Sequence, residues 1–169
     1  MFSLNTTATL HHVTPLPRTI SPTAAINLLH NHDFLIRLDP EYVSHEALPS
    51  SPSSPAAKRY QVTDHMNALP AGLWDTTVKF EAEMTNLEDG ISWLIKAPLG
   101  LVQRTTWRCL KTEAGEEGQG EGEGWCLVED VEIEANRILV GTVKGKCEGN
   151  WRGAHAKFLK GLEGEAERV

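Results

Sequence analysis

Residues 136–162 read NRILVGTVKGKCEGNWRGAHAKFLKGL, and this stretch decides the fold. Its apolar residues follow one another at steps of three or four, the spacing that places side chains on one face of a helix. The series is Val140, Val143, Cys147, Trp151, Ala154, Phe158 and Leu162. This spacing predicts a helix of about seven turns. The helix needs a broad apolar surface to pack on, because each large side chain contributes about 1.5–3 kcal/mol only when fully buried.

Glycine weakens this prediction, because it recurs at every fourth position from 141 to 153. Each glycine costs about 0.5–1 kcal/mol relative to alanine inside a helix. An alternative interpretation makes residues 137–143 a strand and begins the helix at Asn150, a suitable N-cap. The uninterrupted apolar spacing favours the long helix, and both interpretations make the chain helical from Asn150 onward.

The chain before this helix alternates apolar and polar residues in short segments, as half-buried strands do. Ser21-Pro22 offers an N-cap followed by proline, so we expect one or two short helices after the first strand. Asp89-Gly90 predicts a tight hairpin. The expected strands cover residues 4–12, 43–48, 58–66, 76–84, 91–95, 101–109 and 125–133.

Two further segments are unsuited to regular structure. Residues 49–57 are rich in proline and serine, and residues 113–124 are almost all glycine and glutamate. We expect both to be flexible loops. A chain of 169 residues is typical of one domain, so residues 1–169 are expected to form a single domain.

Composition excludes several classes of function. The net charge of −7 disfavours nucleic acid and anionic membranes as partners, since both attract clustered lysine and arginine. No apolar run reaches transmembrane length, and the N-terminus lacks the pattern of a signal peptide. The three cysteines are widely spaced and predict reduced thiols in a cytoplasmic protein. No motif for a metal or another cofactor is present, and the sequence leaves the oligomeric state open.

The order of elements resembles the START-like (SRPBCC, helix-grip) superfamily, in which a curved antiparallel sheet wraps a long C-terminal helix. The resemblance covers nearly the whole chain and depends on that order and on residues 24–48 and 136–162. It implies an α+β fold with about six to seven strands. It also implies kinship with uncharacterised fungal members of the superfamily.

In such a fold the side chains that project from the sheet toward the helix line the space between them. They either fill the core or form an aromatic-lined ligand pocket, and the sequence does not separate these alternatives. The resemblance favours binding of an apolar small molecule of a lipid or polyketide kind. The candidate ligand-binding residues are Tyr60, Val62, Phe80, Met84, Trp93, Trp107, Trp125, Leu127, Trp151 and Phe158.

Polar residues on the inward face are candidates for catalysis. Glu129 is in phase with inward residues of its strand, where burial would raise the pKa of its carboxyl and suit it to act as an acid or base. Alternatively, a β-bulge turns Val128 inward instead. His12 falls on the inward set of the first strand, and His65 lies at a strand end. With Glu129 they are the candidates for a polyketide cyclase or aromatase activity, the alternative to simple binding.

Two other polar residues face the same interior at less certain positions. His155 lies beside the apolar face of the helix, from which it could hydrogen-bond to the sheet. Asp64 is formally inward, but it stands near a strand end, so we interpret it as a capping or turn residue.

Overall fold

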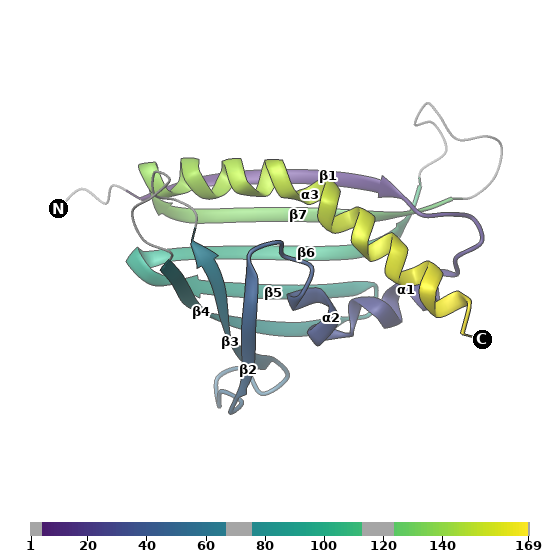
Figure 1. Cartoon of the computed structure of the whole chain (residues 1–169), viewed down its shortest axis with the longest axis horizontal. Helices are drawn as coiled ribbons and strands as arrows, with labels where there is room; N and C mark the ends of the chain where they lie inside the picture. The colour runs from purple at the N-terminus through teal and green to yellow at the C-terminus, as the bar shows by residue number, and fades with distance from the viewer. Residues whose placement is uncertain (1–4, 67–75, 113–123, 169) are drawn as a thin grey trace.

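The computed structural model describes residues 5–66, 76–112 and 124–168 (Figure 1). Seven strands and three α-helices make up this part of the chain. In chain order they are β1 (Asn5–Pro15), α1 (Pro22–Leu29), α2 (His32–Ile36), β2 (Tyr42–Leu48), β3 (Lys58–Met66), β4 (Thr76–Leu87), β5 (Gly90–Ala97), β6 (Leu101–Lys111), β7 (Trp125–Asn136) and α3 (Arg137–Ala166). A short 3₁₀ turn at residues 98–100 joins β5 to β6.

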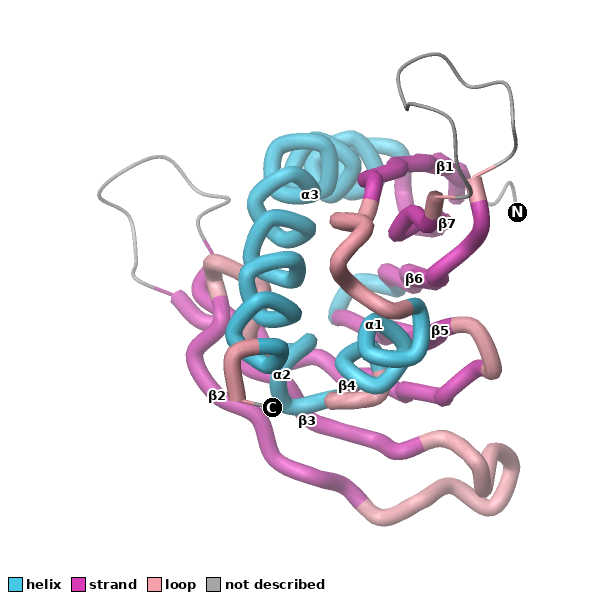
Figure 2. Tube along the Cα trace, turned by 90° about the vertical axis from the view of Figure 1, so that its right-hand side faces the viewer, coloured by secondary structure: helices cyan, strands magenta, loops and turns pink. Residues whose placement is uncertain are grey.

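The strands form one antiparallel sheet in the order β1-β7-β6-β5-β4-β3-β2. The first and last strands are therefore neighbours, although their paired residues stand more than a hundred positions apart. Figure 2 shows the sheet bending around α3, with α1 and α2 at the same concave side. The predicted α+β class and the strand count are confirmed.

The long helix is confirmed, and the alternative strand at residues 137–143 is wrong. Asn136 caps the helix, because its side chain accepts a hydrogen bond from the backbone N–H of Leu139 at 3.0 Å. A Cβ atom added at Gly141, Gly145 or Gly149 would meet nothing within 4 Å. These glycines thus lie away from the sheet, and the helix is held by the packing of its opposite face rather than by intrinsic propensity.

Most sequence-predicted boundaries are within a few residues of the observed ones, and β3 matches at both ends. The hairpin at Asp89-Gly90 is confirmed: β4 ends at Leu87 and β5 begins at Gly90. Residues 49–57 contain only an isolated bridge between Ser51 and Ser54. All but the last residue of the predicted loop at 113–124 lie outside the described residues.

Gly90 is required by a close backbone approach, and its replacement by alanine is expected to destabilise the protein. A Cβ atom there would lie 2.0 Å from the carbonyl oxygen of Trp107, a clash that only backbone movement relieves. Gly90→Ala should therefore lower the free energy of unfolding by about 1–3 kcal/mol in urea denaturation. Gly141→Ala is the matched control. It meets open space in a helix, so it should raise stability by about 0.5–1 kcal/mol.

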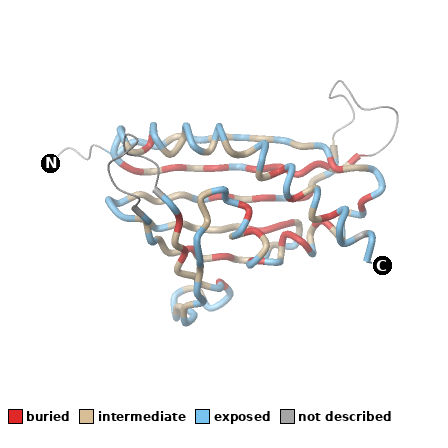
Figure 3. The backbone as a smooth tube through the Cα atoms, viewed as in Figure 1, coloured by how far each residue is buried: buried red, intermediate tan, exposed pale blue. Residues whose placement is uncertain are grey.

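Two apolar clusters fill the concave side, and buried residues run along the middle strands in Figure 3. One cluster joins α1 and α2 to Leu127 of β7 and Phe158 of α3. The other joins the start of α3 to Val131 and Ile133. Residue 129 lies between Leu127 and Val131 on the same face of β7, so a polar position separates the two clusters.

The three cysteines form no disulfide among the described residues, and Cys109 and Cys126 are buried. Within the described ranges, none of the helices combines the length and the apolar character that crossing a bilayer requires.

Candidate functional site

The predicted ligand-binding residues all lie on the concave face of the sheet or on α3. Val62, Met84, Trp107, Leu127 and Phe158 are buried. The others remain partly exposed although they face the interior: Tyr60, Phe80, Trp93, Trp125 and Trp151. The concave face thus combines a packed base with aromatic side chains that keep some accessible surface.

Glu129 projects inward from the middle of β7 and is 6 % exposed. The pairing of β7 with β1 and β6 runs through this position without a bulge, so Val128 does not replace it. His12 Nδ1 donates to Glu129 Oε1 at 2.8 Å, and the Trp107 indole Nε1 donates to Oε2 at 2.5 Å. The same register explains both contacts, because His12 and Trp107 are the residues paired with Glu129 on the two neighbouring strands.

His155 of α3 completes this cluster and is 1 % exposed. Its Nε2 atom lies 3.5 Å from Glu129 Oε2, and its Nδ1 atom lies 2.6 Å from the Thr14 hydroxyl. The carboxylate favours a proton on Nε2, so we assign the Thr14 hydroxyl as donor to Nδ1. The prediction that His155 reaches across to the sheet is confirmed. We call Thr14, His12, Glu129 and His155, with Trp107, the Glu129 cluster.

Aromatic rings enclose the Glu129 cluster. The His12 imidazole stacks on Trp151, with ring centroids 4.4 Å apart and planes 8° apart. His155 makes edge contacts with Trp151 at 5.3 Å and with Trp107 at 4.9 Å. Each such pair contributes about 0.5–1.5 kcal/mol beyond its buried area. The contacts fix both imidazoles in orientation and join α3 to β1 and β6.

The pKa of the Glu129 carboxyl is lowered, which contradicts the raised pKa predicted from burial alone. Burial does act to raise this pKa, and it is the largest single influence. The close approach of His155 and the hydrogen bonds from His12 and Trp107 together outweigh it. Glu129 is therefore an ionised acceptor at neutral pH, suited to hold a proton on either histidine.

Trp107→Phe is expected to destabilise the protein by about 1.5–3 kcal/mol, since it removes a hydrogen bond to a buried carboxylate and keeps the aromatic body. Urea denaturation measures the loss. Trp125→Phe on the same face is the control and should cost less than about 1 kcal/mol. Equal losses in the two variants would show that the bond to Glu129 contributes nothing specific.

The structure does not bring His65 to this cluster. His65 is exposed on β3, on the opposite face from Tyr60 and Val62, and its strand lies far from β7 in the sheet order. The hydroxyl of Tyr60 is instead 3.0 Å from Nδ1 of His32, whose Nε2 lies 2.8 Å from the Asn86 side-chain oxygen. His32 is buried, and sequence reasoning did not identify it as a polar residue of the core.

Asp64 is the second acidic residue of the interior, and its interpretation as a capping or turn residue is wrong. It is 8 % exposed and stands in the paired part of β3, opposite Tyr42 and Val78. Among the described residues, its Oδ1 atom has no hydrogen-bond partner.

The thiols of Cys109 and Cys147 are not suited to nucleophilic chemistry. Burial first, and then the charges of Glu129 and Asp39, raise the pKa of Cys147 to about 12. Burial raises the pKa of Cys109 to about 11. Both thiols stay protonated at neutral pH. Within residues 5–66, 76–112 and 124–168, no three His, Cys, Asp or Glu side chains are arranged to hold a metal ion.

The curved sheet around the long C-terminal helix defines a helix-grip fold, and known structures share this architecture. The aromatase/cyclase Zhui from Streptomyces sp. R1128 superposes with a TM-score of 0.63 at 8 % identity over 94 % of each chain. Norcoclaurine synthase from Thalictrum flavum gives 0.61 at 13 % identity over 99 % of each chain. The aromatase/cyclase BexL gives 0.62 at 10 % identity over 92 % of this chain, which spans about half (50 %) of that di-domain protein. At these identities the likeness establishes the fold.

Residues 5–164 match the family described as Domain of unknown function (DUF7053), and the chain belongs to that family. No protein of curated function matches the sequence.

Proposed function

We propose that the protein binds a largely apolar small molecule, of a lipid or polyketide kind, between the concave face of the sheet and α3. The observation that carries the proposal is the set of inward-facing aromatic residues that stay partly exposed, among them Trp93, Phe80 and Trp151. A purely structural core would bury them, because each large side chain gains about 1.5–3 kcal/mol on full burial. Ligand sites combine such apolar surface with a few oriented polar groups.

The aromatase/cyclases and norcoclaurine synthase of the same fold support this proposal, since their names describe action on small organic molecules. The Glu129 cluster supplies the oriented polar groups here. We also propose that the protein is cytoplasmic and related to uncharacterised fungal members of the superfamily.

Titration with the uncharged fluorescent probe N-phenyl-1-naphthylamine tests the proposal. Saturable quenching of tryptophan fluorescence, with energy transfer to the probe, is expected. Trp93→Ala should weaken binding about tenfold, because it removes one aromatic contact of about 1–1.5 kcal/mol. Leu94→Ala is the control, since Leu94 is equally half-buried on the opposite face of β5. No binding of this probe, of decanol or of anthraquinone would overturn the proposal.

A second candidate is a cyclase-like enzyme, and the Glu129 cluster is the observation that favours it. An imidazole held against a carboxylate can take a proton from a carbon between two carbonyl groups. The resulting enolate carbon attacks another carbonyl of the chain, and the proton returns to the alkoxide formed. Loss of water from this alcohol and enolisation of the remaining ring carbonyl groups then give an aromatic ring. His12 is the candidate base, and Glu129 orients and stabilises it.

This candidate is tested with a short poly-β-keto thioester and the appearance of aromatic absorbance. Turnover above the spontaneous rate is expected, and Glu129→Gln should reduce it about a hundredfold. Glu132→Gln on the convex face should leave it unchanged. Turnover that survives Glu129→Gln would exclude this role for the cluster.

A further inference from the structure

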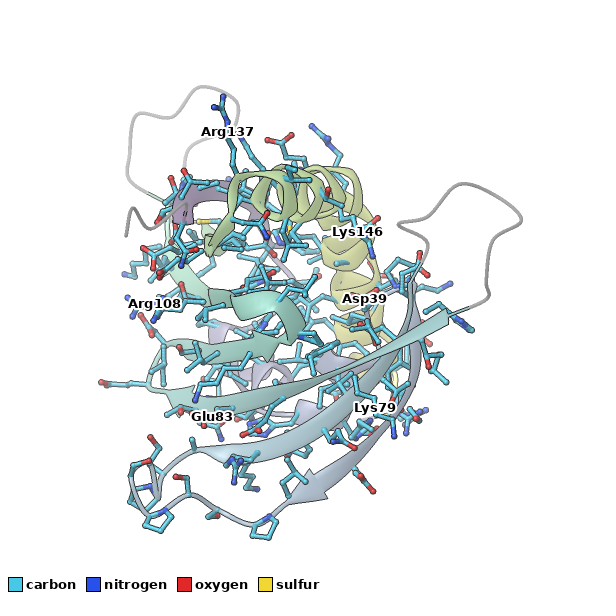
Figure 4. All side chains as sticks on the ribbon, turned by 90° about the vertical axis from the view of Figure 1, so that its left-hand side faces the viewer. Asp39, Lys79, Glu83, Arg108, Arg137 and Lys146 are labelled. Atoms are coloured by element: carbon cyan, nitrogen blue, oxygen red, sulfur yellow. The ribbon has the colours of Figure 1, made fainter. Side chains whose placement is uncertain are left out.

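A second polar position on the concave face lies at the far side of the sheet from the Glu129 cluster. Asp64 shares its face of β3 with Val62 and Tyr60, and β3 is the direct neighbour of the edge strand β2. Figure 4 shows Asp39 and Lys146 on the same side of the molecule, between α3 and the neighbouring strand ends. The charges of both residues influence the Asp64 carboxyl, Asp39 raising its pKa and Lys146 lowering it.

The Asp64 carboxyl is buried and incompletely hydrogen-bonded within the described part of the chain. Only 8 % of the residue is exposed, and Oδ1 has no hydrogen-bond partner among the described residues. A buried acceptor without a partner costs free energy, and such costs persist at positions that serve a ligand. Burial, followed by the charge of Asp39, raises the pKa of Asp64 to about 7, so a small change in its surroundings ionises it.

The charges around Asp64 favour one kind of ligand group as the hydrogen-bond partner of its Oδ1 atom. The neighbours with an influence are Asp39 from the α2–β2 turn, Glu41 before β2, His65 on β3 and Lys146 on α3. With Asp64 ionised, these groups comprise three carboxylates, one ammonium and the imidazole of His65. A positively charged hydrogen-bond donor is therefore favoured over an anion.

We propose that Asp64 forms a subsite for a protonated amine on a ligand whose apolar body lies along the concave face. The inference rests on the proposed function and specifies the chemical class of the ligand. The ammonium donates to Oδ1, while the hydrocarbon part contacts the half-buried aromatic residues of β3 to β5. The ammonium does not bind at the Glu129 cluster, because the Glu129 carboxylate already accepts hydrogen bonds from His12 and Trp107.

Isothermal titration with decylamine, decanol and decanoate, below their aggregation concentrations and at pH 8, tests the subsite. Decylamine should bind about ten- to a hundredfold more tightly than decanol, because its ammonium gains one hydrogen bond to a charged partner. Asp64→Asn should abolish this preference and leave decanol binding unchanged. Asp130→Asn is the matched control, because it removes the same charge from the exposed convex face. In the unaltered protein, decylamine binding should strengthen from pH 5 to pH 8 as Asp64 ionises.

Each other outcome contradicts the subsite in a distinct way. Equal binding of decylamine and decanol, or a preference that survives Asp64→Asn, would overturn it and leave the proposed function standing. Loss of the preference in Asp130→Asn as well would assign it to net charge rather than to Asp64. Failure of all three probes to bind would count against the proposed function and the subsite together.

Discussion

Replacing Glu129 with alanine is expected to lower the free energy of unfolding by about 3–5 kcal/mol, a large share of the stability of a domain of this size. The substitution leaves the ring nitrogens of His12 and His155 and the indole N–H of Trp107 buried and facing an empty volume. Glu129→Gln keeps an acceptor for the indole and should cost less, about 1–2 kcal/mol. Urea denaturation followed by tryptophan fluorescence measures both losses.

Glu132→Ala is the control for this prediction. Glu132 stands on the same strand but faces the convex side, where it lies 3.2 Å from the exposed Arg104. Such surface pairs contribute about 0–1 kcal/mol. The lowered pKa of Glu129 adds a second signature: its contribution is present above the ordinary carboxyl pKa and is lost as the pH falls below it. Equal losses for Glu129→Ala and Glu132→Ala would contradict the buried cluster.

Asp64 is expected to make stability fall as the pH rises. The pKa of Asp64 is raised from 3.8 to about 7, so the folded state keeps a proton that the unfolded state releases over this range. Stability from this group is complete below pH 4 and is lost as the pH approaches 7. The window spans about three pH units at about 1.4 kcal/mol each, an upper limit of about 4 kcal/mol.

The difference in unfolding free energy between Asp64→Asn and the unaltered protein isolates this effect, because all other carboxyl groups titrate in both. Asp64→Asn should gain stability relative to the unaltered protein between pH 4 and pH 8. A difference that stays constant with pH would show that Asp64 is solvated or paired in the folded state.

Much of the fold was predictable because the buried residues of this chain recur at the regular spacing of a strand or of a helix. The alternation of Val78, Phe80 and Ala82 with charged residues defines β4, and the three- and four-residue spacing from Val140 defines α3. The glycines of α3 suggested a strand at residues 137–143 as an alternative, but they did not prevent the prediction of the long helix. The four glycines from 141 to 153 lie where an added Cβ atom would meet no neighbour within 4 Å, so they lower helix propensity without disturbing the packed face.

The inward direction of individual site residues could be predicted from the sequence, but the contacts between them could not. Strand phase placed Glu129 and His12 on the inward face, yet their contact depends on the pairing of β1 with β7 across more than a hundred residues. Phase also carries no information on hydrogen-bond donors, which is why the direction of the Glu129 pKa shift was predicted wrongly. His65 was selected because it lies at a strand end, from which it could reach the mouth of a cavity, although its strand phase placed it outward.

Asp64 was misjudged because strand ends usually fray. Here β2 pairs with β3 up to Asp64, and the backbone N–H of His65 donates to the Glu41 carbonyl at 2.7 Å. The chain before β2 thus covers the end of β3 and buries the carboxyl. The sequence did contain a sign of this burial, because Asp64 alternates in phase with Val62 on the inward face of the strand. The expectation that a strand end frays led us to set that sign aside.

The central claim is that an apolar ligand lies between α3 and the concave face, and the indole N–H signals of tryptophan test it directly. Protein labelled with ¹⁵N at tryptophan, assigned through single Trp→Phe variants, is titrated with N-phenyl-1-naphthylamine. The signals of Trp93 and Trp107, whose ring centroids are 5.7 Å apart on the concave face, should shift together and saturate at one equivalent of probe. Indole signals that remain unchanged up to the solubility limit of the probe would contradict the account.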